Sequence, residues 1–494
     1  MSAIPSPSAA LLRTIEAMAN VKVLCIGDVM LDRFMYGVVD RISPESPIPV
    51  FTHQREEKML GGAGNVVRGV LALGADAGFL SVIGDDTVGN QLTALVGSEA
   101  RLHPYLLSEK NRLSTKKTRY VASGQQLLRA DAETRAPISA ASEQKLLAAA
   151  LAELPQYHVL ILSDYGKGVL TPSLCRALID AANAQSIPVL VDPKHRDIGV
   201  YAGATILSPN LKEMAAAVGV EQFASEAELV AAAAALCAKH HFTYILCTRG
   251  KDGMVLINAA GEVARVATAA REVFDVSGAG DTAIATLAVS LAAGATAEEA
   301  MVLANSAAGV AVGRLGTAVV HQSDLITALF LSHTALQHQK ILPLSYAEEM
   351  VKSWRREGQR IGFTNGCFDI MHAGHATLLA DARAQCDKLI VGINSDASVK
   401  RLKGESRPVN QEFDRAHLLA SLACVDAVII FEEDTPLALI RALKPDILMK
   451  GADYTRETVV GYEIVESYGG KVVLLPLKEG YSTSNIIRKV TSAA

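Results

Sequence analysis

The chain has 494 residues, of which 50% are hydrophobic and 20% charged, and its 47 Lys and Arg against 52 Asp and Glu give a formal net charge of -5. This length exceeds what one hydrophobic core covers, so we expect at least two domains. The balanced charge and the lack of a basic tract exclude a protein that follows a nucleic-acid backbone.

The apolar segments are too short for a membrane span. Ile284–Ala297, among the longest, runs into Glu298 and Glu299, which favours a buried helix. The first residues lack the charged and apolar runs of a signal peptide. Seven scattered cysteines without a Cys-x-x-Cys pair indicate free thiols, and Cys367 is expected to pack rather than react. We expect a cytoplasmic protein with no membrane partner.

Alternating strand and helix patterns fill the first part of the chain. Strand-like runs lie at Val21–Gly27, Val159–Ser163, Pro188–Asp192 and Tyr244–Thr248, separated by alanine-rich stretches that favour helices. Such alternation predicts a parallel sheet covered by helices on both faces. Residues 40–58 and 115–128 look like shorter, polar strands that could form a small lid sheet.

A glycine-rich motif, Asp275-Val276-Ser277-Gly278-Ala279-Gly280-Asp281-Thr282, precedes an alanine-rich helical stretch. Small residues at a helix N-terminus let backbone N–H groups converge on a phosphoryl group. Asp281 then stands where a carboxylate can accept the proton of an attacking hydroxyl. The alternative is an ordinary capping turn after a strand.

An earlier motif, Gly61-Gly62-Ala63-Gly64-Asn65, heads another helix, and the two motifs in this order resemble the ribokinase-like (PfkB) carbohydrate kinases over about residues 20 to 325. The stretches 164–168, 210–213 and 248–253 also match. The family often has Asn-Pro-x-x-Glu where this chain has Pro-Asn-Leu-Lys-Glu, which keeps the Asn and the Glu. The resemblance implies a three-layer α/β/α domain with a small β lid.

The same resemblance implies roles for individual residues. Asp281 would be the catalytic base, and Gly278, Ala279 and Gly280 would form the anion hole. Asn210 and Glu213 would support the Mg-phosphate shell, and the nucleotide would be bordered by Arg249, Gly250, Gly253 and Asn305. The sugar would be held by Asp28, Asp32, Gly61, Gly62, Asn65 and Lys116. For Asp28 and Asp32 the alternative is a solvated loop with capping aspartates.

A second series of strand and helix patterns follows residues 342–344. Its strand-like runs are Arg360–Phe363, Lys388–Gly392, Ala427–Phe431 and Lys471–Leu475. We therefore expect a first domain at residues 1–330, a linker at 331–345 and a second domain at 346–494. The segment His333–Lys340 is interpreted as part of the linker, and a metal role for its histidines is disfavoured.

The second domain begins with the motif Thr364-Asn365-Gly366-Cys367-Phe368-Asp369-Ile370-Met371-His372-Ala373-Gly374-His375, which places two imidazoles at a helix start. From about residue 345 onward the chain resembles the cytidylyltransferase-like nucleotidyltransferases, which implies a Rossmann-like fold. The catalytic residues would be His372, His375 and Lys403. The nucleotide would be bound by Thr364, Asn365, Gly366, Phe368, Asp369, Gly374, Asn394, Asp396, Arg407, Lys450, Ser482, Thr483 and Ser484. A zinc pair is disfavoured because no third ligand accompanies the two histidines.

Taken together, the two halves resemble the bifunctional heptose 7-phosphate kinase/heptose 1-phosphate adenylyltransferases over nearly the whole chain. The resemblance implies ATP-dependent phosphorylation of D-glycero-β-D-manno-heptose 7-phosphate at the anomeric position, removal of the 7-phosphate by a separate phosphatase, and adenylyl transfer to heptose 1-phosphate. The product, ADP-heptose, would serve the lipopolysaccharide inner core. ATP with Mg is the expected cofactor of both steps, and a homodimer is expected through the lid sheets.

Other interpretations stay open at this point. Both reactions could act on another sugar phosphate or use CTP, or one domain could sense a ligand and regulate the other. A substrate that already carries phosphate calls for extra cations, and the cluster Arg112, Lys116, Lys117 and Arg119 near the lid could hold the 7-phosphate. The alternative for this cluster is a solvated strand face.

Overall fold

The computed structural model describes residues 9–269, 276–314, 318–333 and 340–476. The chain divides into two compact units, one ending at Leu325 and the other continuing from Ile326, and each is described by itself. No described helix combines the length and apolar character that crossing a membrane requires. Part of the expected linker is helical, since α10 (Gln322–His333) includes His333 and α11 (Leu344–Arg356) begins at Leu344. Residues 334–339 of that linker, with His338, lie outside the described residues.

The first unit is built on a nine-stranded sheet of order β13-β12-β11-β10-β9-β8-β1-β4-β5. Its strands are β1 (Lys22–Gly27), β4 (Asp76–Gly84), β5 (Leu102–Glu109), β8 (Val159–Ser163), β9 (Val189–Asp192), β10 (Ile206–Leu207), β11 (Tyr244–Thr248), β12 (Met254–Asn258) and β13 (Gly261–Val266). All pairings are parallel except those of β12 with β11 and β13. The four strands expected from the sequence are β1, β8, β9 and β11, so that prediction is confirmed.

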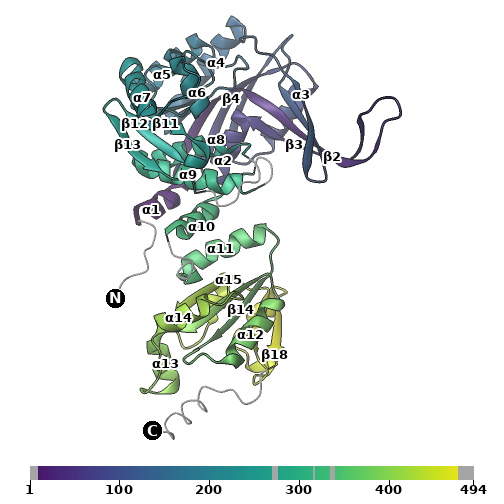
Figure 1. Ribbon diagram of the computed structural model, residues 1–494, viewed down its shortest axis with the longest axis vertical. Coiled ribbons are helices and arrows are strands. Elements are labelled where there is room, and N and C mark those ends of the chain that lie inside the picture. Colours follow the sequence, from purple (N-terminus) through teal and green to yellow (C-terminus); the bar gives the residue numbers. More distant parts are fainter. Residues whose placement is uncertain (1–8, 270–275, 315–317, 334–339, 477–494) are drawn as a thin grey trace. The chain divides into compact units, whose positions relative to one another are not determined.

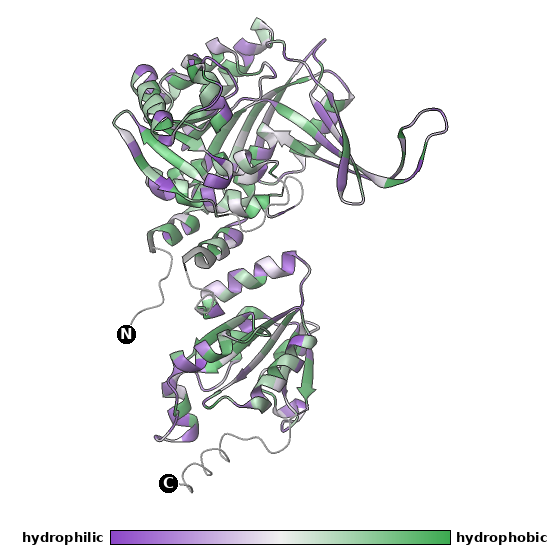
Figure 2. Ribbon diagram, in the orientation of Figure 1, coloured by the Kyte–Doolittle hydropathy of each residue, from purple (hydrophilic) through white to green (hydrophobic). Residues whose placement is uncertain are grey.

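Helices cover both faces of this sheet, as a three-layer domain requires (Figure 1). One face carries α4 (Ala140–Glu153), α5 (Pro172–Ala184), α6 (Leu211–Val218) and α7 (Glu226–His240), which share a buried core with the strands. The other face carries α1 (Ala9–Ala17), α2 (Ala63–Ala72), α8 (Ala279–Ala292) and α9 (Ala297–Val312), and α3 (Thr87–Gly97) packs beside β5. Figure 2 shows that hydrophobic residues concentrate on the main strands.

A separate four-stranded sheet of order β3-β2-β6-β7 forms the lid. Its strands are β2 (Val29–Ile42), β3 (Pro49–Gly62), β6 (Lys116–Ala122) and β7 (Gln125–Ala132). The expectation of short strands was wrong for β2 and β3, which run for 14 residues each. Gly61 and Gly62 end β3 rather than head the helix, which starts at Ala63. A Cβ on Gly62, whose φ is +61°, would lie 2.5 Å from the carbonyl oxygen of Asp28.

The second unit contains a five-stranded parallel sheet of order β16-β15-β14-β17-β18. The strands are β14 (Ile361–Gly366), β15 (Lys388–Asn394), β16 (Ala427–Phe431), β17 (Ile447–Gly451) and β18 (Lys471–Leu475). Helices α11, α15 (Leu437–Leu443) and α16 (Tyr462–Ser467) pack on one face, and α12 (Ala373–Ala384) and α14 (Glu412–Ala420) on the other. The strand order reverses between β14 and β17, which is where ligands bind in Rossmann-like sheets. Strand β17 was missed by the sequence analysis.

Candidate active sites

Asp281 is held by two side chains from distant parts of the chain. It lies in the first turn of α8, directly after Gly278, Ala279 and Gly280, and Gly278 has a φ of +78°. The Nδ2 of Asn65 donates to Asp281 Oδ2 at 2.7 Å, and the hydroxyl of Tyr165 donates to Oδ1. Burial raises the pKa of Asp281, while both hydrogen bonds lower it. A fixed carboxylate therefore stands at a helix N-terminus, as the sequence predicts.

Asp32 lies near this carboxylate, at the start of the lid. It is only 4% exposed and forms an ion pair with Arg119 at 2.7 Å. Burial lowers the pKa of Lys117, while the charge of Asp32 raises it. Asp32 and Lys117 both also affect the pKa of Asp281 electrostatically. A Cβ on Gly61 would lie 2.4 Å from Asp32 Oδ2, so glycine at this position leaves room for the carboxylate.

Asp28 has a different environment from the one expected for a sugar ligand. Its Oδ2 accepts the backbone N–H groups of Tyr165 and Lys167 at 2.9 and 3.0 Å, and its Oδ1 accepts that of Val169 at 3.0 Å. It is 1% exposed, and burial and the charge of Asp164 raise its pKa. Both carboxylate oxygens thus already serve the backbone of one loop.

The four cationic side chains near the lid differ in what they contact. Arg112 is buried and donates to the carbonyls of Ala136 and Lys167, so it braces the backbone and does not belong to a solvent-facing cluster. On β6, Lys117 and Arg119 share the face of Asp32, and Lys116 lies on the opposite face, because side chains alternate along a strand. Lys117 and Arg119 are therefore the cations of β6 that share a face with Asp32, and Lys116, which the sequence analysis placed at the sugar, is not.

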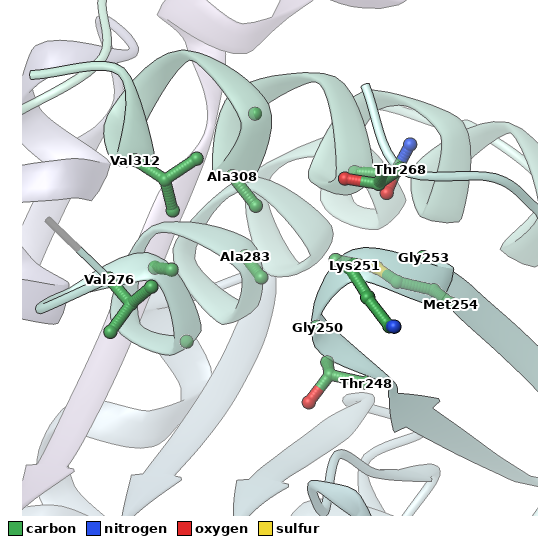
Figure 3. A pocket seen from close by; sticks show the side chains of 14 residues that line it. Thr248, Gly250, Lys251, Gly253, Met254, Thr268, Val276, Ala283, Ala308 and Val312 are labelled. Atoms are coloured by element: carbon green, nitrogen blue, oxygen red, sulfur yellow. The ribbon is translucent and has the colours of Figure 1, made fainter. Parts of the chain in front are cut away.

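A cavity of about 390 Å³ adjoins the N-terminus of α8. Figure 3 shows small and apolar side chains around it, with the Gly250–Met254 turn lying opposite Ala283, Ala308 and Val312. Of the residues expected to border the nucleotide, Gly250, Gly253 and Asn305 line this cavity, as do Ala279 and Gly280. A Cβ on Gly253 would lie 2.0 Å from the carbonyl oxygen of Val266.

Arg249 does not line the cavity, although the sequence analysis placed it at the nucleotide. Its guanidinium pairs with Glu226 and donates to the carbonyl of Asp252 at 2.6 Å. Glu226 begins α7 and Asp252 lies in the turn itself, so the arginine links the turn to that helix.

Asn210 and Glu213 form a capping box at the start of α6, and Glu213 also pairs with Lys194 at 3.0 Å. The sequence analysis missed Asp192, at the carboxyl end of β9. Burial and the charges of Asp281 and Glu213 hold its pKa well above the usual range. This excess of negative charge suits a cation carried by a nucleotide. The signal available was an Asp at the carboxyl end of a parallel strand.

In the second unit, His372 and His375 lie together at the start of α12. His372 is the N-cap residue, and the two rings stack with centroids 3.8 Å apart. Burial lowers the pKa of both imidazoles, that of His375 to about 4 with a contribution from His372. His375 Nδ1 is buried and has no hydrogen-bond partner among the described residues. Burial therefore favours the neutral form of both rings near pH 7.

Other residues of this motif position the histidines and the following loops. Phe368, whose φ is +46°, packs its ring edge-on against His375 at 5.2 Å, and a Cβ on Gly366 would lie 3.1 Å from that ring. Asp369 is 2% exposed, pairs with Arg407, and accepts the backbone N–H groups of Val409 and Asn410. Asp369 and Arg407 are thus joined to each other in this structure.

Lys450 links the two strands at the reversal point of the sheet. It lies near the end of β17 and donates from Nζ to the carbonyl of Asn365, on β14, at 2.7 Å. Burial lowers its pKa to about 8. The Oδ1 of Asn365 is buried and lacks a hydrogen-bond partner within the described segments. An ammonium group and an unpaired acceptor therefore adjoin the histidine motif.

The remaining candidates lie on the neighbouring elements. Asn394, at the end of β15, donates to Ser398 at 3.1 Å, and Asp396 begins α13 (Asp396–Lys403). Lys403 ends that helix and lowers the pKa of the Cys367 thiol, which burial raises. Thr364 is buried within β14, and Gly374 lies in the first turn of α12. Ser482, Thr483 and Ser484 lie outside the described residues.

One buried arginine at this site was missed by the sequence analysis. Arg415 on α14 is fully buried, pairs with Asp396 at 2.7 Å, and donates to the carbonyls of Cys367 and Asn410 at 2.6 and 3.0 Å. It joins the motif loop, the start of α13 and the segment before α14. Because these partners are distant in the sequence, no local pattern identifies them.

Comparison with known proteins identifies the family of each unit. A family model described as pfkB family carbohydrate kinase matches residues 20–323, and one described as cytidylyltransferase-like matches residues 363–489. Proteins named "Bifunctional protein HldE" from Paramagnetospirillum magneticum and Rhodospirillum rubrum are 53% and 50% identical to this chain. The matches cover 97% and 98% of this chain and 98% and 97% of those proteins. The chain belongs to the HldE family of bifunctional proteins.

Solved structures show the fold of the first unit. The phosphofructokinase-2 of Escherichia coli in complex with potassium is 20% identical with a TM-score of 0.54, over 63% of this chain and 99% of that one. Arabidopsis thaliana ribokinase complexed with ribose and ATP is 19% identical with a TM-score of 0.50, over 63% and 98%. The ribokinase-like fold is therefore confirmed. The protein is a bifunctional enzyme that combines a sugar kinase with a nucleotidyltransferase.

Proposed function

We propose that the first unit phosphorylates heptose 7-phosphate at its anomeric hydroxyl with ATP, and that the second transfers the adenylyl group of ATP to heptose 1-phosphate. The observation that carries the kinase step is Asp281, held by Asn65 and Tyr165 beside a cavity lined by small residues. The observation that carries the second step is the pair of neutral imidazoles next to Lys450 at the reversal point of the sheet.

In the kinase step, Asp281 accepts the proton of the anomeric hydroxyl as its oxygen forms a bond to the γ-phosphorus. The bond from that phosphorus to the β,γ-bridging oxygen breaks, and ADP leaves. Backbone N–H groups at the start of α8 stabilise the charge on the transferring group. Mg²⁺ would neutralise charge on the nucleotide phosphates, with Asn210 and Glu213 supporting this shell. The raised pKa of Asp192 supports a cation there.

We assign the 7-phosphate to Lys117 and Arg119, which share one face of β6. Lys117→Met should raise the KM for heptose 7-phosphate about tenfold or more, because a charge-assisted hydrogen bond is lost. Lys116→Met is the matched control, since Lys116 lies on the other face of the same strand. Equal KM values for the two variants would remove this assignment.

In the second step the nucleophile is a sugar phosphate, which is already anionic, so no general base is needed. Its oxygen attacks the α-phosphorus of ATP, and the bond to the α,β-bridging oxygen breaks to release pyrophosphate. His372, His375 and Lys450 are placed to donate hydrogen bonds to the phosphates. The buried, unpaired Oδ1 of Asn365 can accept one from the ligand.

One experiment tests both steps. The purified chain is incubated with heptose 7-phosphate, ATP and Mg²⁺, with and without a bisphosphate phosphatase, and the products are identified by mass spectrometry. We expect the 1,7-bisphosphate without the phosphatase and ADP-heptose with it. ATP and CTP are compared side by side in the second reaction, and a preference for CTP would refute the adenylyl assignment.

The proposal also covers the intervening phosphatase, the cell compartment, the oligomeric state and the domain boundaries. Because the second step uses the 1-phosphate, a separate phosphatase must act between the two reactions. We propose that the enzyme acts in the cytoplasm of a bacterium that makes lipopolysaccharide, since it uses nucleotide and sugar-phosphate substrates. We also propose that the chain forms a homodimer through its lid sheets and divides into domains at residues 1–330 and 346–494. Analytical ultracentrifugation checks the oligomeric state.

A further inference from the structure

The loop between β8 and α5 links Asp28 to Asp281, two aspartates of the kinase site. Asp28 accepts three backbone N–H groups from this loop, those of Tyr165, Lys167 and Val169, at 2.9 to 3.0 Å. Asp164 stabilises the same loop from inside, since its Oδ1 accepts the N–H of Gly166 at 2.7 Å. The backbone that carries Tyr165 is therefore fixed by the buried carboxylate of Asp28, which lies between β1 and the first lid strand, β2.

Tyr165 extends from this loop to Asp281. Its hydroxyl donates to Oδ1, while Asn65 donates to Oδ2 from α2. Burial and the negative charges of Asp281 and Asp192 raise the pKa of Tyr165 well above its usual value, so the hydroxyl stays protonated and donates. With one donor on each oxygen, the plane of the carboxylate is fixed relative to α8.

We propose that Tyr165 is a positioning residue for Asp281, and that Asp28 serves the kinase reaction by anchoring the loop that carries Tyr165 rather than by binding the sugar. The inference rests on the kinase function proposed above and deepens it. It gives Asp28 and Tyr165 indirect roles, both exerted through the catalytic carboxylate.

The hydroxyl of Tyr165 matters because it sets the direction in which the Asp281 carboxylate points. A general base must present a lone pair within hydrogen-bond reach of the hydroxyl that it deprotonates, and small misplacements of reacting groups cost large factors in rate. A phenylalanine at position 165 would fill the same volume but would leave Oδ1 free to rotate. The hydroxyl therefore affects turnover through geometry, while the substrates bind elsewhere in the site.

The test measures kinase kinetics of the full chain with heptose 7-phosphate and ATP. Wild-type turnover is measured first, because its absence would refute the proposed function and not this inference. Tyr165→Phe should then lower kcat about ten- to a hundredfold and leave both KM values within about twofold. Tyr157→Phe is the matched control, since it removes the hydroxyl of another buried tyrosine of the same unit, and it should keep wild-type kcat.

A double-mutant cycle separates positioning from a general structural role. If Tyr165 acts through Asp281, adding Tyr165→Phe to Asp281→Asn should not lower the residual rate further. An equal fold loss in both backgrounds overturns the proposal, as does unchanged kcat in Tyr165→Phe alone. Asp28→Asn provides a second measurement: kcat should fall with little change in the KM for the sugar. A large rise in that KM with kcat retained would show that Asp28 binds the sugar after all.

Discussion

Replacing Lys450 by methionine should stabilise the second unit and weaken its catalysis. The ammonium group is buried, and its pKa falls from 10.5 to about 8. At about 1.4 kcal/mol per pKa unit, this fall corresponds to roughly 3 kcal/mol of unfavourable free energy for the charged form in the folded protein. Methionine has a similar length and no charge, so it avoids this cost.

Two favourable contacts of Lys450 offset part of that gain. The hydrogen bond from Nζ to the carbonyl of Asn365 contributes about 1 kcal/mol, and the contact with the ring of Tyr454, 5.3 Å away, about 0.5 to 1 kcal/mol. The net expectation for Lys450→Met at pH 7 is an increase of about 1 kcal/mol in the free energy of unfolding. Adenylyl transfer should fall at the same time, because a cation beside the phosphates is lost.

The stability difference between Lys450→Met and the wild type should depend on pH. Below pH 8 Lys450 is protonated in both the folded and unfolded states, and the full cost of the buried charge is present. Between pH 8 and pH 10.5 the folded protein releases the proton while the unfolded chain keeps it, so wild-type stability rises with pH in this window. The advantage of Lys450→Met should therefore be present at pH 7 and disappear toward pH 10.

Trp354 provides the assay, because it is the single tryptophan of the chain and lies in α11 of the second unit. Urea unfolding followed by its fluorescence reports the stability of that unit at each pH. Lys400→Met, on the exposed side of α13, is the control and should change stability by less than about 0.5 kcal/mol. A Lys450→Met protein that is less stable than wild type at pH 7, by an amount that does not vary with pH, would refute the argument.

Three further outcomes follow from the two sites. Asp281→Asn should lower sugar phosphorylation to a small residual rate and spare adenylyl transfer, while His375→Ala should do the reverse, and separate product assays will show full activity in the affected reaction if either assignment is wrong. Gly61→Ala places a Cβ 2.4 Å from Asp32 Oδ2 and should raise the KM for the sugar about tenfold or more, while Gly97→Ala, which meets nothing within 4 Å, should have no effect on that KM. Because the pKa of His375 is lowered to about 4, adenylyl transfer should stay constant from pH 7 to about pH 5, and a loss of activity centred near pH 6.5 would contradict the buried, neutral imidazole.

The sequence analysis located the candidate catalytic groups but missed most of the groups that hold them. Asp281, His372 and His375 stand in short motifs whose spacing carries the signal. The partners that fix them come from far away: Tyr165 bonds to Asp281 across 116 residues, and Arg415 bonds to the carbonyl of Cys367 across 48. Such contacts depend on strand order and loop conformation, which a local pattern does not encode.

The errors in secondary structure have similar physical causes. Strand β17 (Ile447–Gly451) is a short run that ends in Lys450 and Gly451, and periodicity alone does not distinguish such a run from other buried segments. In the lid, β2 shifts register between Tyr36 and Gly37, which interrupts the alternation expected of a half-buried strand. Strand β2 pairs with both β3 and β6, and a local sequence pattern does not reveal these partners.

In each site, burial shifts the pKa of the candidate catalytic groups in the direction that suits the nucleophile of that reaction. A sugar hydroxyl has to lose a proton, and in the first unit a carboxylate whose pKa is raised by burial is better matched to that task than an exposed aspartate. A sugar phosphate has no proton to lose at neutral pH, and in the second unit burial keeps the imidazoles neutral, so that they donate hydrogen bonds without competing for a proton. Burial therefore favours the protonated form of an acid in one site and the unprotonated form of a base in the other, because in each case it disfavours the charged form.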